Sequence, residues 1–204
     1  MLHISNYSRI RNQSLSVNGR AVYQGKDNSN NSFLDDAFAS LGLVYPKYFK
    51  MDRMSKAGFL AAELLVRECS EMAAYPRAGI SVVLANAHAS LDTDLQYFES
   101  MKTFASPSLF VYTLANIVTG EICIRHGFIG ENAFLVSEKF SAVQLHEYVT
   151  ILMALDRSVV CLAGWVDVLG DQIDVFLYLV DKKGGAHLAG HTIREIQKLY
   201  DADN

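Results

Sequence analysis

Three apolar segments, each about the length of one strand, constrain the fold of this chain more than any other feature. They span residues 80–85, 158–163 and 173–180, and the last is the most hydrophobic. Segments with helical periodicity separate the first two of them. Strands that are apolar throughout must be covered on both faces, which predicts a mostly parallel sheet with helices on both sides. The last segment follows its predecessor too closely for a crossover helix, so we expect that pair to be antiparallel.

The remaining elements follow from turn and capping residues. Asn18-Gly19 is a hairpin-type turn signal between two short strands within residues 15–23. Ser106-Pro107 is typical of a helix start, and Gly127 of a helix end. The other predictions are a polar loop over 26–32, helices over 33–41, 51–69, 106–127, 141–155 and 192–200, strands over 133–136 and 166–169, and a turn over 182–185.

Composition narrows the function classes. With 204 residues and half of them hydrophobic, the chain suits one domain that needs neither a disulfide nor a metal for stability. A net charge of −4 gives no basic surface for nucleic acid. No apolar segment reaches the length of a membrane span, and the N-terminus does not resemble a secretory signal. We therefore expect a cytoplasmic protein whose cysteines are buried, reduced thiols: Cys69, Cys123 and Cys161.

Metal and cofactor motifs are absent from the sequence. His187 and His191 are four residues apart, but Gly190 lies between them in a predicted loop. The six histidines form no H-x-x-x-H pair within one predicted helix, and the sequence shows no adjacent constellation of carboxylates. The aspartates match no calcium-binding loop and are predicted to lie in solvated turns; they are Asp92, Asp94, Asp167, Asp171 and Asp174.

The order and spacing of several short motifs resemble the N-terminal half of the β-ketoacyl synthases. Ser106-Pro107 opens a helix that carries Asn116, and Ala163-Gly164 ends a strand in ungapped register with Gly130. Met51-Asp52-Arg53 is similar to a helix start of that family. The resemblance is strongest over residues 45–180. It implies an α/β, three-layer α/β/α thiolase-like half-fold in residues 1–204, with a mixed, mostly parallel sheet of about five strands.

Two departures from the family pattern argue against ketosynthase activity. Lys139, flanked by Glu138 and Phe140, occupies the position of the family's nucleophilic cysteine. The sequence also stops before the half that supplies the family's two catalytic histidines, which implies neither nucleophile nor oxyanion stabilisation. The chain resembles the short partners, regarded as chain-length-factor counterparts, that accompany full ketosynthases in aryl-polyene or flexirubin-type pathways.

The resemblance also implies positions for an interface. In ketosynthases, the segment that matches residues 109–113 lies at the dimer interface and reaches the partner's acyl tunnel. The strand over 133–136 would be an exposed edge that pairs with a partner. Trp165 could either plug a tunnel or fill the core. The interface and tunnel candidates are Leu109, Phe110, Tyr112, Thr113, Phe134 and Trp165.

The leading hypothesis is a non-catalytic subunit that pairs with a full-length β-ketoacyl synthase in fatty-acid or polyene-type biosynthesis. It needs no cofactor and meets acyl carrier protein only indirectly. Two alternatives stay open. One is acyl transfer or malonyl decarboxylation by Lys139 with Glu138. The other is a homodimeric acyl-binding module.

Overall fold

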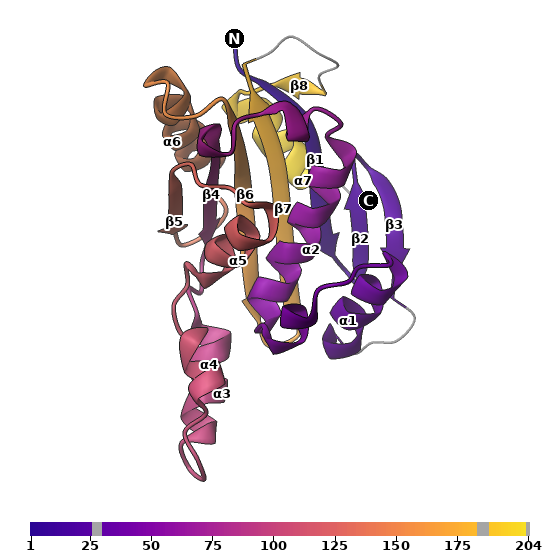
Figure 1. Ribbon diagram of the computed structural model, residues 1–204, viewed down its shortest axis with the longest axis vertical. Coiled ribbons are helices and arrows are strands. Elements are labelled where there is room, and N and C mark those ends of the chain that lie inside the picture. Colours follow the sequence, from indigo (N-terminus) through magenta and orange to yellow (C-terminus); the bar gives the residue numbers. More distant parts are fainter. Residues whose placement is uncertain (26–29, 183–187, 203–204) are drawn as a thin grey trace.

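A single mixed sheet between two helical layers forms the body of the molecule in the computed structural model (Figure 1). The structure describes residues 1–25, 30–182 and 188–202. The strand order is β3-β2-β1-β7-β6-β4-β5, and β8 pairs with β1. The strands are β1 (His3–Arg11), β2 (Ser14–Val17), β3 (Arg20–Gln24), β4 (Ile80–Asn86), β5 (Asn132–Val136), β6 (Val160–Leu169), β7 (Gln172–Asp181) and β8 (Ala189–Gly190).

The three-layer α/β architecture is as predicted, but the sheet has eight strands instead of about five. Only β4 with β5 and β4 with β6 are parallel pairs, whereas the others, including the predicted β6–β7 pair, are antiparallel. Two strands were missed: β1 alternates polar and apolar residues instead of being apolar throughout, and β8 has only two residues. Since β7 is antiparallel to both β1 and β6, the strands β1, β4, β5 and β6 run in one direction. Their carboxyl ends therefore meet at one edge of the body.

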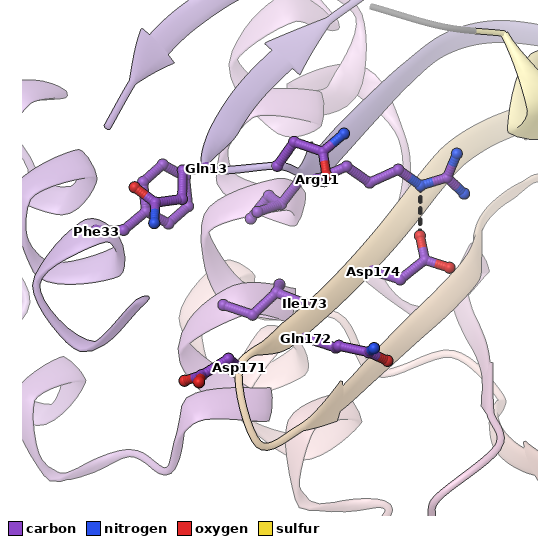
Figure 2. A pocket seen from close by; sticks show the side chains of 9 residues that line it. Arg11, Gln13, Phe33, Asp171, Gln172, Ile173 and Asp174 are labelled. Carbon is purple, nitrogen blue, oxygen red and sulfur yellow. Dashed lines mark hydrogen bonds and ion pairs between the residues drawn. The ribbon is translucent and has the colours of Figure 1, made fainter. Parts of the chain in front are cut away.

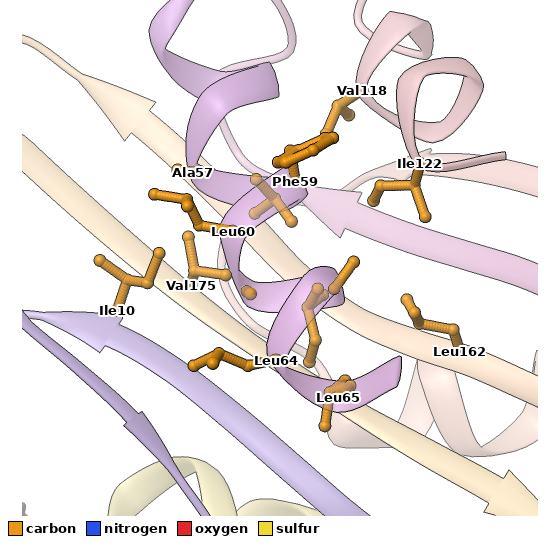
Figure 3. Packing of buried hydrophobic residues seen from close by; sticks show 14 of the residues in the cluster. Ile10, Ala57, Phe59, Leu60, Leu64, Leu65, Val118, Ile122, Leu162 and Val175 are labelled. Atoms are coloured by element: carbon orange, nitrogen blue, oxygen red, sulfur yellow. The ribbon is translucent and has the colours of Figure 1, made fainter. Parts of the chain in front are cut away.

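The first helical layer contains α1 (Asn30–Ser40), α2 (Arg53–Glu68) and α5 (Ile117–His126). Asp52 caps α2, because its side chain accepts a hydrogen bond from the Ser55 N–H at 3.0 Å. The predicted apolar face of α2 is buried against the sheet and α5, where Phe59 and Leu60 have no exposed surface (Figure 3). Burying such a side chain contributes about 1.5–3 kcal/mol, so this layer supplies much of the stability.

The second layer consists of α6 (Ala142–Ala154) and α7 (Ile193–Asp201), which cover the opposite face of the sheet. Ser141 and Thr192 accept hydrogen bonds at the two helix starts. The guanidinium of Arg9 on β1, only 1% exposed, donates to the carbonyls of Leu199 and Ala202 at the end of α7. The last helix is thereby fixed to the first strand.

The prediction of one helix over residues 106–127 is wrong. The segment forms a short α4 (Pro107–Val111) and a separate α5, with a turn between them. The hydroxyl of Thr113 donates to the Phe110 carbonyl at 2.8 Å, a local bond that competes with the regular helical pattern. Ser106 caps α4, as its predicted role requires.

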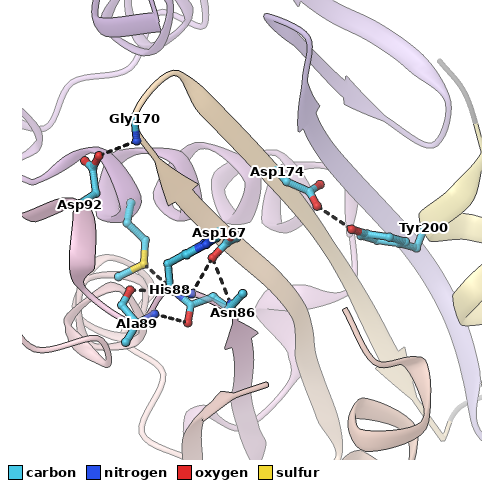
Figure 4. A network of polar contacts seen from close by, with 10 residues as sticks. Asn86, His88, Ala89, Asp92, Asp167, Gly170, Asp174 and Tyr200 are labelled. Carbon is cyan, nitrogen blue, oxygen red and sulfur yellow. Dashed lines mark hydrogen bonds and ion pairs between the residues drawn. The ribbon is translucent and has the colours of Figure 1, made fainter. Parts of the chain in front are cut away.

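An unpredicted helix, α3 (Leu91–Ser100), follows β4. Asp92 and Asp94 lie in its first turn, so the prediction of a solvated turn is wrong there. Asp92 accepts a hydrogen bond from the Gly170 N–H at 2.9 Å (Figure 4). It also lies 3.5 Å from the Arg53 guanidinium. A carboxylate in the first turn of a helix interacts favourably with the helix dipole. These contacts also hold the start of α3 against the sheet.

Several local predictions are settled by the structure. Asn18 and Gly19 have φ of 50° and 77°, as their tight turn requires. The strands predicted over 158–163 and 166–169 are one strand, β6. Cys161 is buried, whereas Cys69 and Cys123 are half-buried, and all three are free thiols. Most of the loop predicted over 26–32 and of the turn over 182–185 lies outside the described residues.

Candidate functional site

The loop between β5 and α6 carries Lys139, at the edge where the carboxyl ends of the strands meet. The Ser137 N–H donates to the Asn86 carbonyl at 3.0 Å, which fixes the loop beside the end of β4. The Ser137 hydroxyl donates to the carbonyl of Lys139 at 2.9 Å. The side chains of Glu138 and Lys139 are exposed, and within the described chain neither forms an ion pair. The helix start predicted at residue 141 is confirmed, since Ser141 caps α6, whereas the match of Lys139 to the position of the family's nucleophile stays a prediction.

An aromatic cluster closes the space beneath this loop. Phe140 stacks on Tyr200 of α7 with ring centroids 3.6 Å apart and an interplanar angle of 4°. The Phe140 ring also forms T-shaped contacts with the rings of Trp165 and Phe176, with centroids 5.9 Å and 6.0 Å apart. Trp165 is 3% exposed and packs in the second core cluster. Of the two predicted placements, the structure shows Trp165 within the core, while a role at an acyl tunnel stays a prediction.

A histidine–carboxylate pair that the sequence did not reveal lies at the same edge (Figure 4). His88 Nδ1 is 2.8 Å from Asp167 Oδ2, and Asp167 Oδ1 accepts the N–H groups of Ala87 and His88. The expectation that Asp167 lies in a solvated turn is therefore wrong. The pair joins β4 to β6 across 79 residues of sequence, a separation that no local motif could indicate. Within the described residues, Asp167 acts as the cap of the chain after β4.

Asp174 was also predicted to lie in a solvated turn, but its carboxylate is hydrogen-bonded to two side chains. Its carboxylate accepts the Tyr200 hydroxyl at 2.6 Å and the Arg11 Nε at 2.5 Å. Arg11 and Asp174 line an open pocket of about 530 Å³ at the β1 and β7 hairpins, together with Gln13 and Phe33 (Figure 2). These bonds fasten α7 to the sheet, so the carboxylate has a structural role here.

The segment between β4 and α5 projects beyond the body as an arm, which we define as residues 91–116 (Figure 1). The interface candidates predicted over residues 109–113 differ in exposure. Phe110 is 59% exposed, and Leu109 and Thr113 are half-buried. Tyr112 is buried, with its hydroxyl 3.2 Å from the Glu121 carboxylate. Burial and that carboxylate raise the pKa of Tyr112. The arm exposes eight large apolar side chains: Leu91, Leu95, Phe98, Met101, Phe104, Phe110, Val111 and Leu114.

The strand β5 forms one end of the sheet, as predicted. It pairs with β4 on one side, and no described strand pairs with its other side. Val136 is 56% exposed, while Phe134 is half-buried and packs against the first core cluster. Unpaired N–H and C=O groups along an edge strand form a template for pairing with another chain.

Comparison with solved structures identifies the fold, although no family model and no curated protein matches the sequence. The ishigamide ketosynthase/chain length factor aligns over 89% of this chain and 62% of that chain, with 15% identity and a TM-score of 0.63. The chain has a ketosynthase fold. It spans about three-fifths of the length of the ishigamide ketosynthase/chain length factor chain.

Two further ketosynthase-fold structures support this result. One is a chain from the complex of a ketosynthase (ApeO) with its chain length factor (ApeC) from Xenorhabdus doucetiae. It has 12% identity and a TM-score of 0.59, and covers 98% of this chain and 90% of that chain. The other is a β-ketoacyl synthase from Burkholderia phymatum STM815, with 10% identity and a TM-score of 0.59, covering 89% of this chain and 59% of that chain.

Within the described part of this ketosynthase fold, no group of three metal-ligating side chains comes together. His191 is buried and stacks on His146 with centroids 5.0 Å apart, whereas His187 lies outside the described residues. No described helix is both long and apolar enough to span a bilayer.

Proposed function

We propose that this chain is a non-catalytic subunit that pairs with a full-length β-ketoacyl synthase. The observation that carries the proposal is the arm, whose apolar side chains are exposed on the same molecule as the open edge of β5. Apolar patches of this kind mark protein interfaces. Two of the similar structures are named as ketosynthase and chain length factor pairs, which supports a partner of that class.

The rest of the hypothesis concerns the pathway. The pair would act in fatty-acid or polyene-type acyl elongation in the cytoplasm, with no cofactor on this subunit. The acyl chain would arrive on an acyl carrier protein that the catalytic partner binds. The half-buried and exposed residues of 109–113 are the proposed place where the subunit limits acyl length.

Catalysis by Lys139 is the less favoured function. A lysine nucleophile or base must lose its proton, which burial or a neighbouring cation promotes. The Lys139 side chain is exposed instead, and the cluster of Phe140, Trp165 and Tyr200 fills the space beneath the loop. Acylation of an amine by a thioester would also give an amide that does not turn over readily.

Replacing Lys139 with methionine is therefore expected to leave function intact. The Lys139→Met subunit should support elongation by its ketosynthase within about twofold of the wild-type rate, because no bond of the side chain is lost. The measurement is product formation on acyl carrier protein with the mixed subunits. Loss of activity, with the complex still assembled, would favour the enzymatic alternative.

Association is tested by mixing the chain with the full ketosynthase encoded nearest to it. Phe110→Asp should weaken the complex at least 100-fold, since it places a charge in a desolvated apolar interface. Ile124→Asp on α5 is the matched control, because Ile124 is 65% exposed and outside the arm. Binding is followed by surface plasmon resonance, with thermal unfolding to verify both variants.

The outcome separates the partner classes. A stable complex that is active only when both proteins are present supports the proposal. A tight homodimer that ignores the ketosynthase, as seen by sedimentation velocity, would replace it with the homodimeric module. Equal effects of the Phe110 and Ile124 variants would exclude the arm as the interface.

A further inference from the structure

The arm buries almost none of its apolar side chains. The structure describes residues 91–116 throughout, and among them only Thr93 and Tyr112 are buried, with 2% and 6% of their surface exposed. The rings of Tyr97 on α3 and Phe110 on α4 are in contact, with centroids 5.5 Å apart. Two short helices with so little apolar packing do not keep one direction unless something else holds them to the body.

The two buried side chains of the arm each carry a hydroxyl, and each donates it to a carboxyl group of the body. The Thr93 hydroxyl lies 2.8 Å from Asp52 Oδ2, and the Tyr112 hydroxyl lies 3.2 Å from Glu121 Oε1. Both carboxyl groups belong to the first helical layer, since Asp52 caps α2 and Glu121 lies on α5. The arm is therefore attached through α3 on one side and through the end of α4 on the other.

The two carboxyl groups are themselves fixed and buried. Asp52 Oδ1 accepts the Ser55 N–H at 3.0 Å, which leaves the second oxygen for the arm. The Lys47 ammonium lies 2.8 Å from Glu121 Oε2, which leaves Oε1 for the arm. Asp52 is 9% exposed and Glu121 is 4% exposed. An arm in another direction would leave both buried oxygens without their hydroxyl donors, which is costly.

Further contacts hold the two ends of the arm in place. The Ser90 hydroxyl, directly before α3, donates to the Thr113 carbonyl after α4 at 2.9 Å. The segments that enter and leave the arm therefore lie side by side. The bond from the Gly170 N–H to Asp92 adds a contact with the turn between β6 and β7 (Figure 4).

We propose that Thr93 and Tyr112 are positioning residues, which fix the direction of the arm before the partner ketosynthase binds. This inference rests on the proposed function, in which the arm contacts that partner. An arm already held in its binding direction loses less conformational freedom on association. The apparent affinity is reduced in proportion when only a fraction of the molecules hold that direction. Tyr112 thus acts through its exposed neighbours Phe110 and Val111, because it is itself buried.

Hydrogen exchange of the isolated chain, followed by mass spectrometry, tests the two hydroxyls without a partner. In the Thr93→Val/Tyr112→Phe double variant, the α3 amides should exchange about tenfold faster than in wild type, and the β6 and β7 amides should be unchanged. Tyr148→Phe/Thr150→Val is the matched control, because it makes the same two replacements on α6, outside the arm. The control should leave α3 exchange within about twofold of wild type.

The single variant Tyr112→Phe keeps the test decisive if the double variant does not fold. It leaves Glu121 beside Lys47, so no buried carboxyl group loses all its partners. We expect about threefold faster exchange of the α3 amides in this variant, since one of the two hydroxyl bonds remains. Urea unfolding verifies that the body of each variant is folded.

Surface plasmon resonance with the full ketosynthase measures the consequence for the partner. The double variant should bind about tenfold more weakly than wild type, although it keeps every exposed apolar side chain of the arm. Unchanged α3 exchange in the variants would overturn the proposal, as would faster exchange with unchanged affinity. If the wild-type chain binds no ketosynthase, the proposed function fails, whereas the exchange result still decides whether the two hydroxyls fix the arm.

Discussion

The Gly164→Ala variant is expected to fail to fold. Gly164 lies in the middle of β6, opposite Leu177 of β7, and an added Cβ would lie 2.0 Å from the Phe176 carbonyl oxygen and 2.8 Å from the Leu177 Cα. Both contacts are with backbone, which cannot rotate away as a side chain can. Since β7 pairs on both sides and is buried over Val175–Asp181, the clash should cost more than about 4 kcal/mol, a large part of the stability of a domain.

Soluble yield and thermal unfolding followed by circular dichroism measure this effect. Gly120→Ala is the matched control, because a Cβ there meets nothing within 4 Å and Gly120 lies inside α5. It should raise the stability by up to about 1 kcal/mol. A cooperative Gly164→Ala protein with the unfolding temperature of the wild type would show that β6 and β7 can separate locally without penalty.

Acid should destabilise the protein strongly between pH 6.5 and about 4. Burial, together with the neighbouring His146, lowers the pKa of His191 to about 4, from 6.5 for the free side chain. Within this window the unfolded chain binds a proton that folded His191 does not, so the free energy of unfolding falls as the pH falls. The difference between a pKa of 6.5 and one of about 4 corresponds to about 3 kcal/mol for this group. His126, whose pKa is also lowered to about 4, adds a contribution in the same direction.

Urea unfolding at several pH values isolates the His191 contribution. Within the described residues neither ring nitrogen of His191 has a hydrogen-bond partner, so His191→Phe removes no bond and keeps the stacking on His146. The variant should lose about 3 kcal/mol less than wild type between pH 7 and pH 4. If the free energy of unfolding fell equally in both proteins, His191 would bind a proton as readily in the folded chain as in the unfolded chain, and its burial would not lower its pKa.

The parts of the fold that the sequence predicted best are those buried on both sides. The strands β4, β6 and β7 had to be apolar throughout, so their composition alone marked them. Helices such as α2 were predictable because a capping aspartate, Asp52, precedes an apolar stripe. The resemblance to ketosynthases, carried by motif order instead of single residues, predicted the fold that the solved structures share.

The features that were missed depend on contacts between distant segments. The acidic start of α3 was predicted to be a solvated turn. It is helical in the structure, where Asp92 contacts Gly170 and Arg53 from distant segments. The His88–Asp167 pair forms only when β4 and β6 are adjacent. Local propensity carries no information about such pairings.

The bond between Arg9 and the end of α7 has a consequence for synthesis of the protein. The strand β1, which is translated before the other described strands, lies between β2 and β7, and the carbonyls that accept hydrogen bonds from its arginine belong to Leu199 and Ala202. The nascent chain must therefore hold β1 without β7 and α7 until those two elements have been translated. Pairings between such distant segments form slowly and leave strand edges exposed in the meantime. Ribosome-bound chains of this protein should thus depend on chaperones until α7 has left the ribosome.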